Sequence, residues 1–123
     1  MPITTDQANY NGNAPYKSNL TGKYLEKTVS VKELNAANPW GLRHMSGNVW
    51  EWVQDYYHKN PEKSLDRRDP MGLSKGADTF GYERVVRGCG WYNGVDYCRS
   101  ADRGSHSASH PDNSIGFRLV RTL

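Results

Sequence analysis

The segment that most constrains the fold is Val49-Trp50-Glu51-Trp52-Val53, because it places two tryptophans two residues apart. Successive side chains of a β-strand alternate between its two faces, so both indoles would share one face and Glu51 the other. Only 36% of the chain is hydrophobic, whereas it contains four Trp and eight Tyr, so aromatic rings must supply much of the buried area. We therefore predict a core strand here, with Glu51 in a setting that needs a cation or strong hydrogen-bond donors.

Weaker patterns predict the other elements of the fold. Tyr24–Lys32 contains alternating β-branched residues and fits a short strand, and 31–37 could form a helical turn that ends before Pro39. Arg84–Gly88 predicts a short strand that enters a glycine turn, and Gly116–Val120 predicts a closing strand. Residues 54–82 form a connection that is too long to serve only as a connecting loop in a small domain.

Length and charge exclude several classes of protein. A chain of 123 residues predicts one domain over 1–123, with a scaffold over 1–86 and a glycine turn, surface and closing strand over 87–120. The formal charge of +3 is small, and acidic and basic residues are interleaved, so we expect no nucleic-acid partner. We also expect no membrane insertion, because neither a membrane span nor a signal pattern is present; display on a cell or virion surface stays open.

The stretch from Tyr92 to Ser114 has a composition that suits a contact surface. It is rich in Tyr, Ser, Gly, Asp, His and Asn, and Tyr offers contact area while small polar residues offer adaptable hydrogen bonds. The alternative is an ordinary solvated loop. We expect a protein or another macromolecule to bind through residues 89–114, at Tyr92, Gly94, Asp96, Tyr97, Asp102, Gly104, Ser105, His106, Ser107, Ser109 and His110.

Two further patterns leave alternatives open. Cys89 and Cys98 are nine positions apart, and this spacing is compatible with a disulfide or with two separate thiols. His106 and His110 are four apart, but a helix between Gly104 and Pro111 is disfavoured and no third metal ligand is placed.

Five motifs together closely resemble the C-terminal half of the formylglycine-generating enzyme (sulfatase-modifying factor) family. They are Asn38-Pro39-Trp40-Gly41-Leu42, Met45-Ser46-Gly47-Asn48-Val49-Trp50-Glu51-Trp52, Arg84-Val85-Val86-Arg87-Gly88 with Trp91, Cys98-Arg99-Ser100-Ala101, and Ile115-Gly116-Phe117-Arg118-Leu119-Val120. The resemblance implies a C-type-lectin-like fold of the α+β class, mostly β and irregular, in a minimal or truncated version. The first half of the family domain is absent, which suggests an oligomer or a fragment that completes another chain.

The resemblance also bears on chemistry. It implies a structural calcium ion at Asn48 and Glu51, against the alternative of a hydrogen-bonded turn with Glu51 paired to an arginine. The oxidase members carry two cysteines at the positions of Asn93 and Cys98, so one thiolate of a copper pair is missing here. We therefore expect no catalytic residues and no required cofactor; oxidation of a peptide cysteine is the alternative function.

Within the same superfamily, the chain looks closer to the variable proteins of diversity-generating retroelements. These resemble it in having the glycine turn, Trp, Cys-Arg-Ser-Ala and Ile-Gly-Phe-Arg-Leu as a framework around a hypervariable stretch. Their adenine-directed mutagenesis of Asn codons cannot yield Lys, Glu, Gln, Met or Trp, and none of these five occurs between Tyr92 and Ser114. We predict a non-enzymatic binding protein whose C-terminal surface is diversified.

Overall fold

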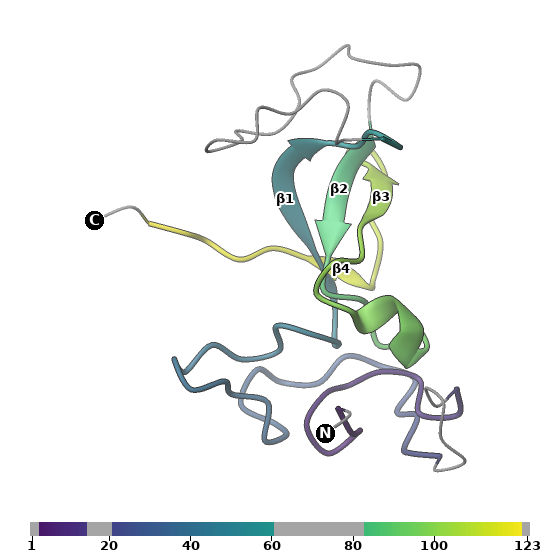
Figure 1. The fold of residues 1–123 in the computed structure, drawn as a ribbon, viewed down its shortest axis with the longest axis vertical. Helices are drawn as coiled ribbons and strands as arrows, with labels where there is room; N and C mark the ends of the chain where they lie inside the picture. Colours follow the sequence, from purple (N-terminus) through teal and green to yellow (C-terminus); the bar gives the residue numbers. More distant parts are fainter. Residues whose placement is uncertain (1–2, 15–20, 61–82, 122–123) are drawn as a thin grey trace.

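The computed structural model describes residues 3–14, 21–60 and 83–121. Its centre is a four-stranded sheet in the order β3-β2-β1-β4, with β1 at Trp50–Tyr56, β2 at Glu83–Arg87, β3 at Gly104–Ser107 and β4 at Ile115–Gly116 (Figure 1). β2 is antiparallel to β1 and β3, and β4 is parallel to β1. A short 3-10 helix, η2 at Val95–Cys98, joins the end of β2 to β3.

The tryptophan strand forms the predicted core element. Trp50 is buried and packs in one cluster with Tyr10, Val86 and the two cysteines, while Trp52 lies half-buried against that cluster. Trp50 and Tyr10 are thus the aromatic residues of the buried core among the described residues, whereas Trp40 is 83% exposed, so the aromatic rings supply only part of the core.

The turn before β1 ties the irregular N-terminal half to the C-terminal half. Gly47 N donates to Gly88 O at 2.6 Å, Asn48 N donates to Asn9 O at 2.7 Å, and Trp91 N donates to Asn48 O at 2.9 Å. Gly47 has φ +87°, and a Cβ there would lie 2.7 Å from Asn9 O, so only glycine fits. Residues 3–14 and 21–49 gather at the end of the sheet where β1 begins (Figure 1).

The predicted strand at Tyr24–Lys32 is wrong, because no strand forms in this segment. Its backbone is bound by a side chain instead of a neighbouring strand. Val29 N donates to Asn48 Oδ1 at 2.8 Å, and Asn48 Nδ2 donates to Val29 O at 3.2 Å. The amide of Asn48 thus supplies the donor and the acceptor that a partner strand would supply.

Two other local predictions need correction. Residues 31–37 form turns rather than a helical element, with Glu33 N donating to Ser30 O at 3.0 Å and Leu34 at φ 62°. The closing strand is shorter than Gly116–Val120, since β4 ends at Gly116. The five residues that follow leave the sheet as an extended arm (Figure 1). Part of the long connection, residues 61–82, lies outside the described residues.

The two cysteines are joined. A disulfide links Cys89, which is fully buried after the glycine turn, to Cys98 at the end of η2. Of the two alternatives that the spacing allowed, the structure has the bonded one. The bond closes a short loop that contains Trp91, Tyr92 and Tyr97.

We predict that Asn48→Ala lowers the free energy of unfolding by about 2–4 kcal/mol, because it removes the partner of the buried Asn9 side-chain N–H and of the part-buried backbone N–H and C=O of Val29. The backbone φ of 74° at Asn48 adds to the cost, since alanine tolerates this region less well than asparagine. Urea unfolding measures the change. Asn113→Ala, at an exposed position, is the control, and equal effects of the two variants would contradict the assignment.

We also predict that reduction of Cys89–Cys98, or Cys98→Ala, lowers the free energy of unfolding by about 2–3 kcal/mol, the value expected for opening a loop of this length. Denaturant curves with and without dithiothreitol measure the difference. Because Cys89 is fully buried, a thiol reagent should label the protein only after unfolding and reduction. An unfolding midpoint that does not respond to reductant would refute this role.

Candidate ligand-binding surface

The eleven residues predicted to contact a ligand lie on η2, β3 and their flanking loops, and none of them is buried. The most exposed side chains come from the two ends of the stretch, with β3 between them. These exposed residues are Tyr92, Asp96, Tyr97, Ser109 and His110.

The first part of this surface is a hollow of about 510 Å³ beside η2, which we call the η2 hollow. Four of the predicted residues line it: Asp96, Tyr97, Asp102 and Gly104. Trp50, Asn93, Arg99 and Arg103 complete the lining, although they were not predicted as contact residues. The hollow is therefore lined by two aromatic residues, Trp50 and Tyr97, and by charged residues of both signs.

Asn93 belongs to the framework beneath the η2 hollow. Its Oδ1 accepts a hydrogen bond from Trp50 Nε1 at 2.8 Å and another from Gly90 N at 3.0 Å. Its backbone carbonyl also accepts from Asn11 N at 2.9 Å. The side chain thus satisfies the buried indole N–H of the core strand and fixes the glycine turn, so its acceptor is engaged inside the protein.

Two of the predicted contact residues have framework contacts of their own. A Cβ at Gly104 would lie 2.9 Å from Val86 Cγ2 and 3.5 Å from the Trp50 ring, so a larger residue would disturb the core. The Asp102 carboxylate accepts hydrogen bonds from Arg99 Nε at 3.1 Å and Nη2 at 2.8 Å. Gly104 and Asp102 therefore contribute to the framework of the surface as well as to the lining of the hollow.

The second part is a hollow of about 370 Å³ at the loop that connects β3 to β4 along the chain, which we call the β3–β4 hollow. Ser109 and His110 line it together with Trp52, Ala108, Pro111, Asp112 and Ile115. Ser109 Oγ lies 2.9 Å from Ser107 Oγ and 3.3 Å from His110 Nδ1, so the polar atoms of this loop form a local chain of contacts.

Asp112 forms local hydrogen bonds within the loop of the β3–β4 hollow. Its Oδ1 accepts hydrogen bonds from Ser114 Oγ at 2.5 Å and Ser114 N at 2.7 Å. These bonds lower the pKa of the Asp112 carboxyl, and the nearby His106 acts in the same direction. His106 Nε2 lies 3.7 Å from Asp112 Oδ2, and its ring meets Trp52 edge-on at 5.9 Å between centroids.

An aromatic cluster supports the exposed ring of Tyr92. Trp91 meets Tyr92 edge-on, with centroids 5.6 Å apart, and stacks with Tyr24 at 6.3 Å. Tyr24 comes from the N-terminal half, so both halves of the chain contribute to the support. A ring held in this way loses little freedom on binding.

The arginines of the region bind atoms of the protein itself. Arg87 Nη1 donates to Asp102 O at 3.1 Å, and Arg103 Nη1 donates to His58 O at 3.2 Å. Arg118 forms a two-point ion pair with Glu51, with Nε–Oε2 at 2.7 Å and Nη2–Oε1 at 2.6 Å. The pairing raises the pKa of Arg118, chiefly through its hydrogen bonds to Glu51.

The residues that the resemblance assigns to calcium do not offer free ligands. Both Glu51 oxygens accept from Arg118, and Asn48 Oδ1 accepts from Asn9 Nδ2 at 3.1 Å as well as from Val29 N. The described residues contain no group of three or more His, Cys, Asp and Glu suited to a metal. This donor set fits the alternative of a hydrogen-bonded turn with a Glu–Arg pair, so we assign the ion no role.

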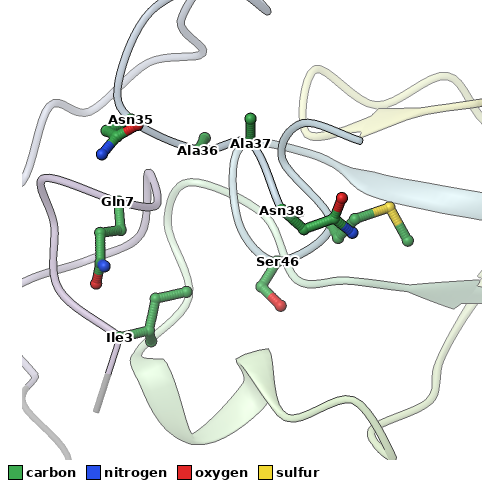
Figure 2. Close-up of a pocket in the computed structure, with 8 residues that line it drawn as sticks. Ile3, Gln7, Asn35, Ala36, Ala37, Asn38 and Ser46 are labelled. Atoms are coloured by element: carbon green, nitrogen blue, oxygen red, sulfur yellow. The ribbon is translucent and has the colours of Figure 1, made fainter. Parts of the chain in front are cut away.

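A further hollow, of about 330 Å³, lies away from the predicted surface. Figure 2 shows Ile3 and Gln7 on one side of it and 35–38 on the other. The side-chain amides that line it form hydrogen bonds within their own turns. Gln7 Oε1 accepts from Thr4 N at 3.2 Å, and Asn38 Oδ1 accepts from Leu42 N at 3.0 Å. We assign no ligand to this hollow.

Sequence reasoning missed the contact between Trp50 and Asn93 beneath the surface. Composition marks residues of a contact type, but it does not mark a core side chain that reaches the surface from a distant strand. The one available signal for Asn93 was its place next to the glycine turn, where Asn commonly bonds to backbone N–H groups.

The structure also defines the two positions at which the oxidase members carry cysteines. Asn93 provides the acceptor for the Trp50 indole, and Cys98 Sγ is bonded to Cys89. A pair of free thiolates for a soft metal is therefore absent at these two positions.

Comparison with known proteins finds similar sequences in formylglycine-generating enzymes and in serine/threonine-protein kinases. The formylglycine-generating enzyme of Streptomyces coelicolor is 30% identical over 114 residues, which cover 90% of this chain and 34% of that protein. Serine/threonine-protein kinase pkn1 of Chlamydia pneumoniae is 32% identical over 88 residues, which cover 70% of this chain but 13% of the kinase. The chain thus spans about a third or less of these relatives.

Within its described residues, no helix has the length and hydrophobicity of a membrane span.

Two solved structures share the fold. Treponema denticola variable protein 1 superposes with a TM-score of 0.64 and 26% identity, over 92% of this chain and 35% of that one. PvdO from Pseudomonas aeruginosa superposes with a TM-score of 0.61 and 20% identity, over 95% of this chain and 50% of that one. The C-type-lectin-like fold and the variable-protein pattern predicted from the sequence are confirmed.

The family itself is defined by a match along nearly the whole chain. The Sulfatase-modifying factor enzyme 1-like domain matches residues 3–123. With this match, the chain belongs to the family of sulfatase-modifying factor enzyme 1-like domains.

Proposed function

We propose that the chain is a non-enzymatic ligand-binding protein, in which residues 89–114 display a hypervariable surface on a C-type-lectin-like scaffold. A retroelement would diversify the surface, and the ligand would be a protein or another macromolecule. The observation that carries the proposal is that the side chains of this stretch fall into two groups. The side chains that hold the fold bond inward, while Tyr92, Asp96, Tyr97, Ser109 and His110 face solvent.

The physical basis of binding would be a rigid support with interchangeable side chains. The disulfide and the Asn93 hydrogen bonds fix the loop that carries Tyr92 and Tyr97. Tyr92 and Tyr97 are 45% and 59% exposed, so each can bury a large ring on contact with a partner. The similarity to a variable protein of known structure supports such a scaffold.

The alternative, oxidation of a peptide cysteine, gains support from the enzyme relatives but not from the site. The chain spans only 34% of the Streptomyces enzyme. At the two cysteine positions of the oxidases it has an engaged amide and a sulfur in a disulfide. The binding function requires no cofactor, whereas the oxidase would require free thiolates. We therefore favour the binding function.

A matched pair of variants tests whether the inward-bonded side chains stabilise the fold while the exposed ones do not. Asn93→Ala should lower the free energy of unfolding by about 2–3 kcal/mol, because it leaves the Trp50 indole N–H and the Gly90 N–H unpaired. Tyr97→Ala, at an exposed ring, should change it by less than about 0.5 kcal/mol. Thermal and urea unfolding measure both. A large loss of stability for Tyr97→Ala together with none for Asn93→Ala would reverse the two assignments.

Sequencing the 3′ end of the gene across its source population tests diversification. We expect substitutions at adenines of a nearby near-copy, concentrated at exposed positions such as Tyr92, Tyr97 and His110. Asn93, Cys89 and Cys98 should stay fixed, because their contacts hold the fold. An invariant 3′ end would refute the retroelement proposal. Variation at Asn93 as frequent as at Tyr97 would show that the framework assignment is wrong.

A further inference from the structure

The side-chain amide of Asn93 has an orientation that its hydrogen bonds determine. Its two framework partners, Trp50 Nε1–H at 2.8 Å and Gly90 N–H at 3.0 Å, are both donors. An amide oxygen accepts such bonds and an amide nitrogen does not, so Oδ1 must be the atom that faces the core. The NH2 group on the other side of the amide therefore points away from Trp50 and Gly90.

This NH2 group is open to the η2 hollow. Asn93 is half-buried and lines that hollow. Among the described residues, Nδ2 has no hydrogen-bond partner, and the buried side-chain nitrogens that lack a partner belong to His44. Nδ2 is therefore accessible, and it offers two N–H donors in the wall of the hollow. Because folding has already fixed the amide, a ligand that accepts from it need not order this side chain.

The charged residues of the hollow favour an anionic ligand group. Arg99 and Asp102 bind each other, since both Asp102 oxygens accept from Arg99. The other two are Arg103, which is half-buried, and Asp96, which is exposed on the first turn of η2. Water and salt screen an exposed charge more than a half-buried one, so Arg103 contributes more to the potential inside the hollow.

The guanidinium of Arg103 is fixed but not saturated by its contacts with the described residues. Nη1 donates to His58 O at 3.2 Å, and the group lies 5.4 Å from the centre of the Tyr57 ring. A guanidinium has five N–H donors, so further donors are available to a ligand. A fixed amide donor and a fixed guanidinium in one hollow suit a carboxylate, which accepts hydrogen bonds and carries negative charge.

We propose that the η2 hollow binds a carboxylate of the ligand through the Nδ2–H groups of Asn93 and the guanidinium of Arg103. The inference rests on the proposed binding function and names the chemical group that the surface recognises. The carboxylate is an acidic side chain or the C-terminus of a protein ligand. Trp50 and Tyr97 also line the hollow and offer apolar contacts to the atoms that carry the carboxylate. Asn93 then has two roles, because its oxygen stabilises the glycine turn and its nitrogen binds the ligand.

Titration of the isotope-labelled protein with small carboxylates, followed by NMR, tests the site without a known ligand. The α-amide of N-acetylglutamate carries a side-chain carboxylate, N-acetylglycine carries a C-terminal one, and the α-amide of N-acetylglutamine is the neutral control. The NH2 resonances of Asn93 should shift with at least one carboxylate and not with the glutamine compound. The tighter of the two carboxylates identifies the source. Equal shifts with the glutamine compound, or none with either carboxylate, would overturn the proposal.

Asn93→Asp is the most specific variant. It has the shape of the native residue and keeps an oxygen for Trp50 and Gly90, but it replaces the donor with a second acceptor. We expect it to fold and to bind the carboxylate probe at least about tenfold more weakly. Asn113→Asp is the matched control, since it adds the same charge at an exposed position that does not line the hollow. It should change the affinity by less than about twofold.

Two further variants should change the affinity in opposite directions. Arg103→Gln should weaken binding of the carboxylate about fivefold, and Asp96→Asn should strengthen it about twofold. Circular dichroism and the indole N–H resonance of Trp50 check folding, and Arg103→Gln decides the outcome if Asn93→Asp does not fold. An affinity that falls as much in Asn113→Asp as in Asn93→Asp, or that does not fall in Arg103→Gln, would refute the site. Gene sequencing tests the diversified surface separately, so failure of this site and failure of that proposal are distinguishable.

Discussion

The rest of the structure depends on the turn at Gly47 and Asn48, because it connects segments that no sheet connects. The N-terminal half has no strand in its described residues, so its backbone groups need partners from elsewhere. The Asn48 side chain serves Asn9 and Val29, while the turn backbone bonds to Asn9, Gly88 and Trp91. One amide and one glycine thus join the irregular half, the tryptophan strand and the loop that carries the candidate surface.

Side-chain hydrogen bonds connect the loops of the candidate surface to this core and fix their conformation. Asn93 connects the buried indole of Trp50 to the glycine turn, and Asp112 connects the far loop to the buried Ser114. Ser114 O in turn accepts from Trp50 N at 2.7 Å. A residue of β1 therefore lines each of the two hollows, Trp50 in one and Trp52 in the other, although their exposed side chains come from separate loops.

The sequence predicted the elements whose signal is local, and it failed where a distant partner decides. Two tryptophans at a spacing of two identified β1, and the β-branched pair before Gly88 identified β2. At 24–32 the alternation was real, but the Asn48 amide took the place of a partner strand. At 117–120 the strand pattern was also real, but no partner is present among the described residues. The predicted contact residues rest on composition and stay a prediction. The inward contacts of Asn93 and Gly104 could not be predicted, because they depend on Trp50 and Val86, which lie on other strands.

The disulfide between Cys89 and Cys98 has a consequence for the entropy of binding. A surface loop held at one end would lose many conformations when a ligand orders it, and that loss would subtract from every affinity. Here the loop that carries Tyr92 and Tyr97 is closed covalently at both ends, so most of that ordering already takes place during folding. Replacing an exposed ring then changes the contacts made with a ligand while leaving the ordering cost nearly constant. Affinities of different variants would therefore report the displayed side chains themselves.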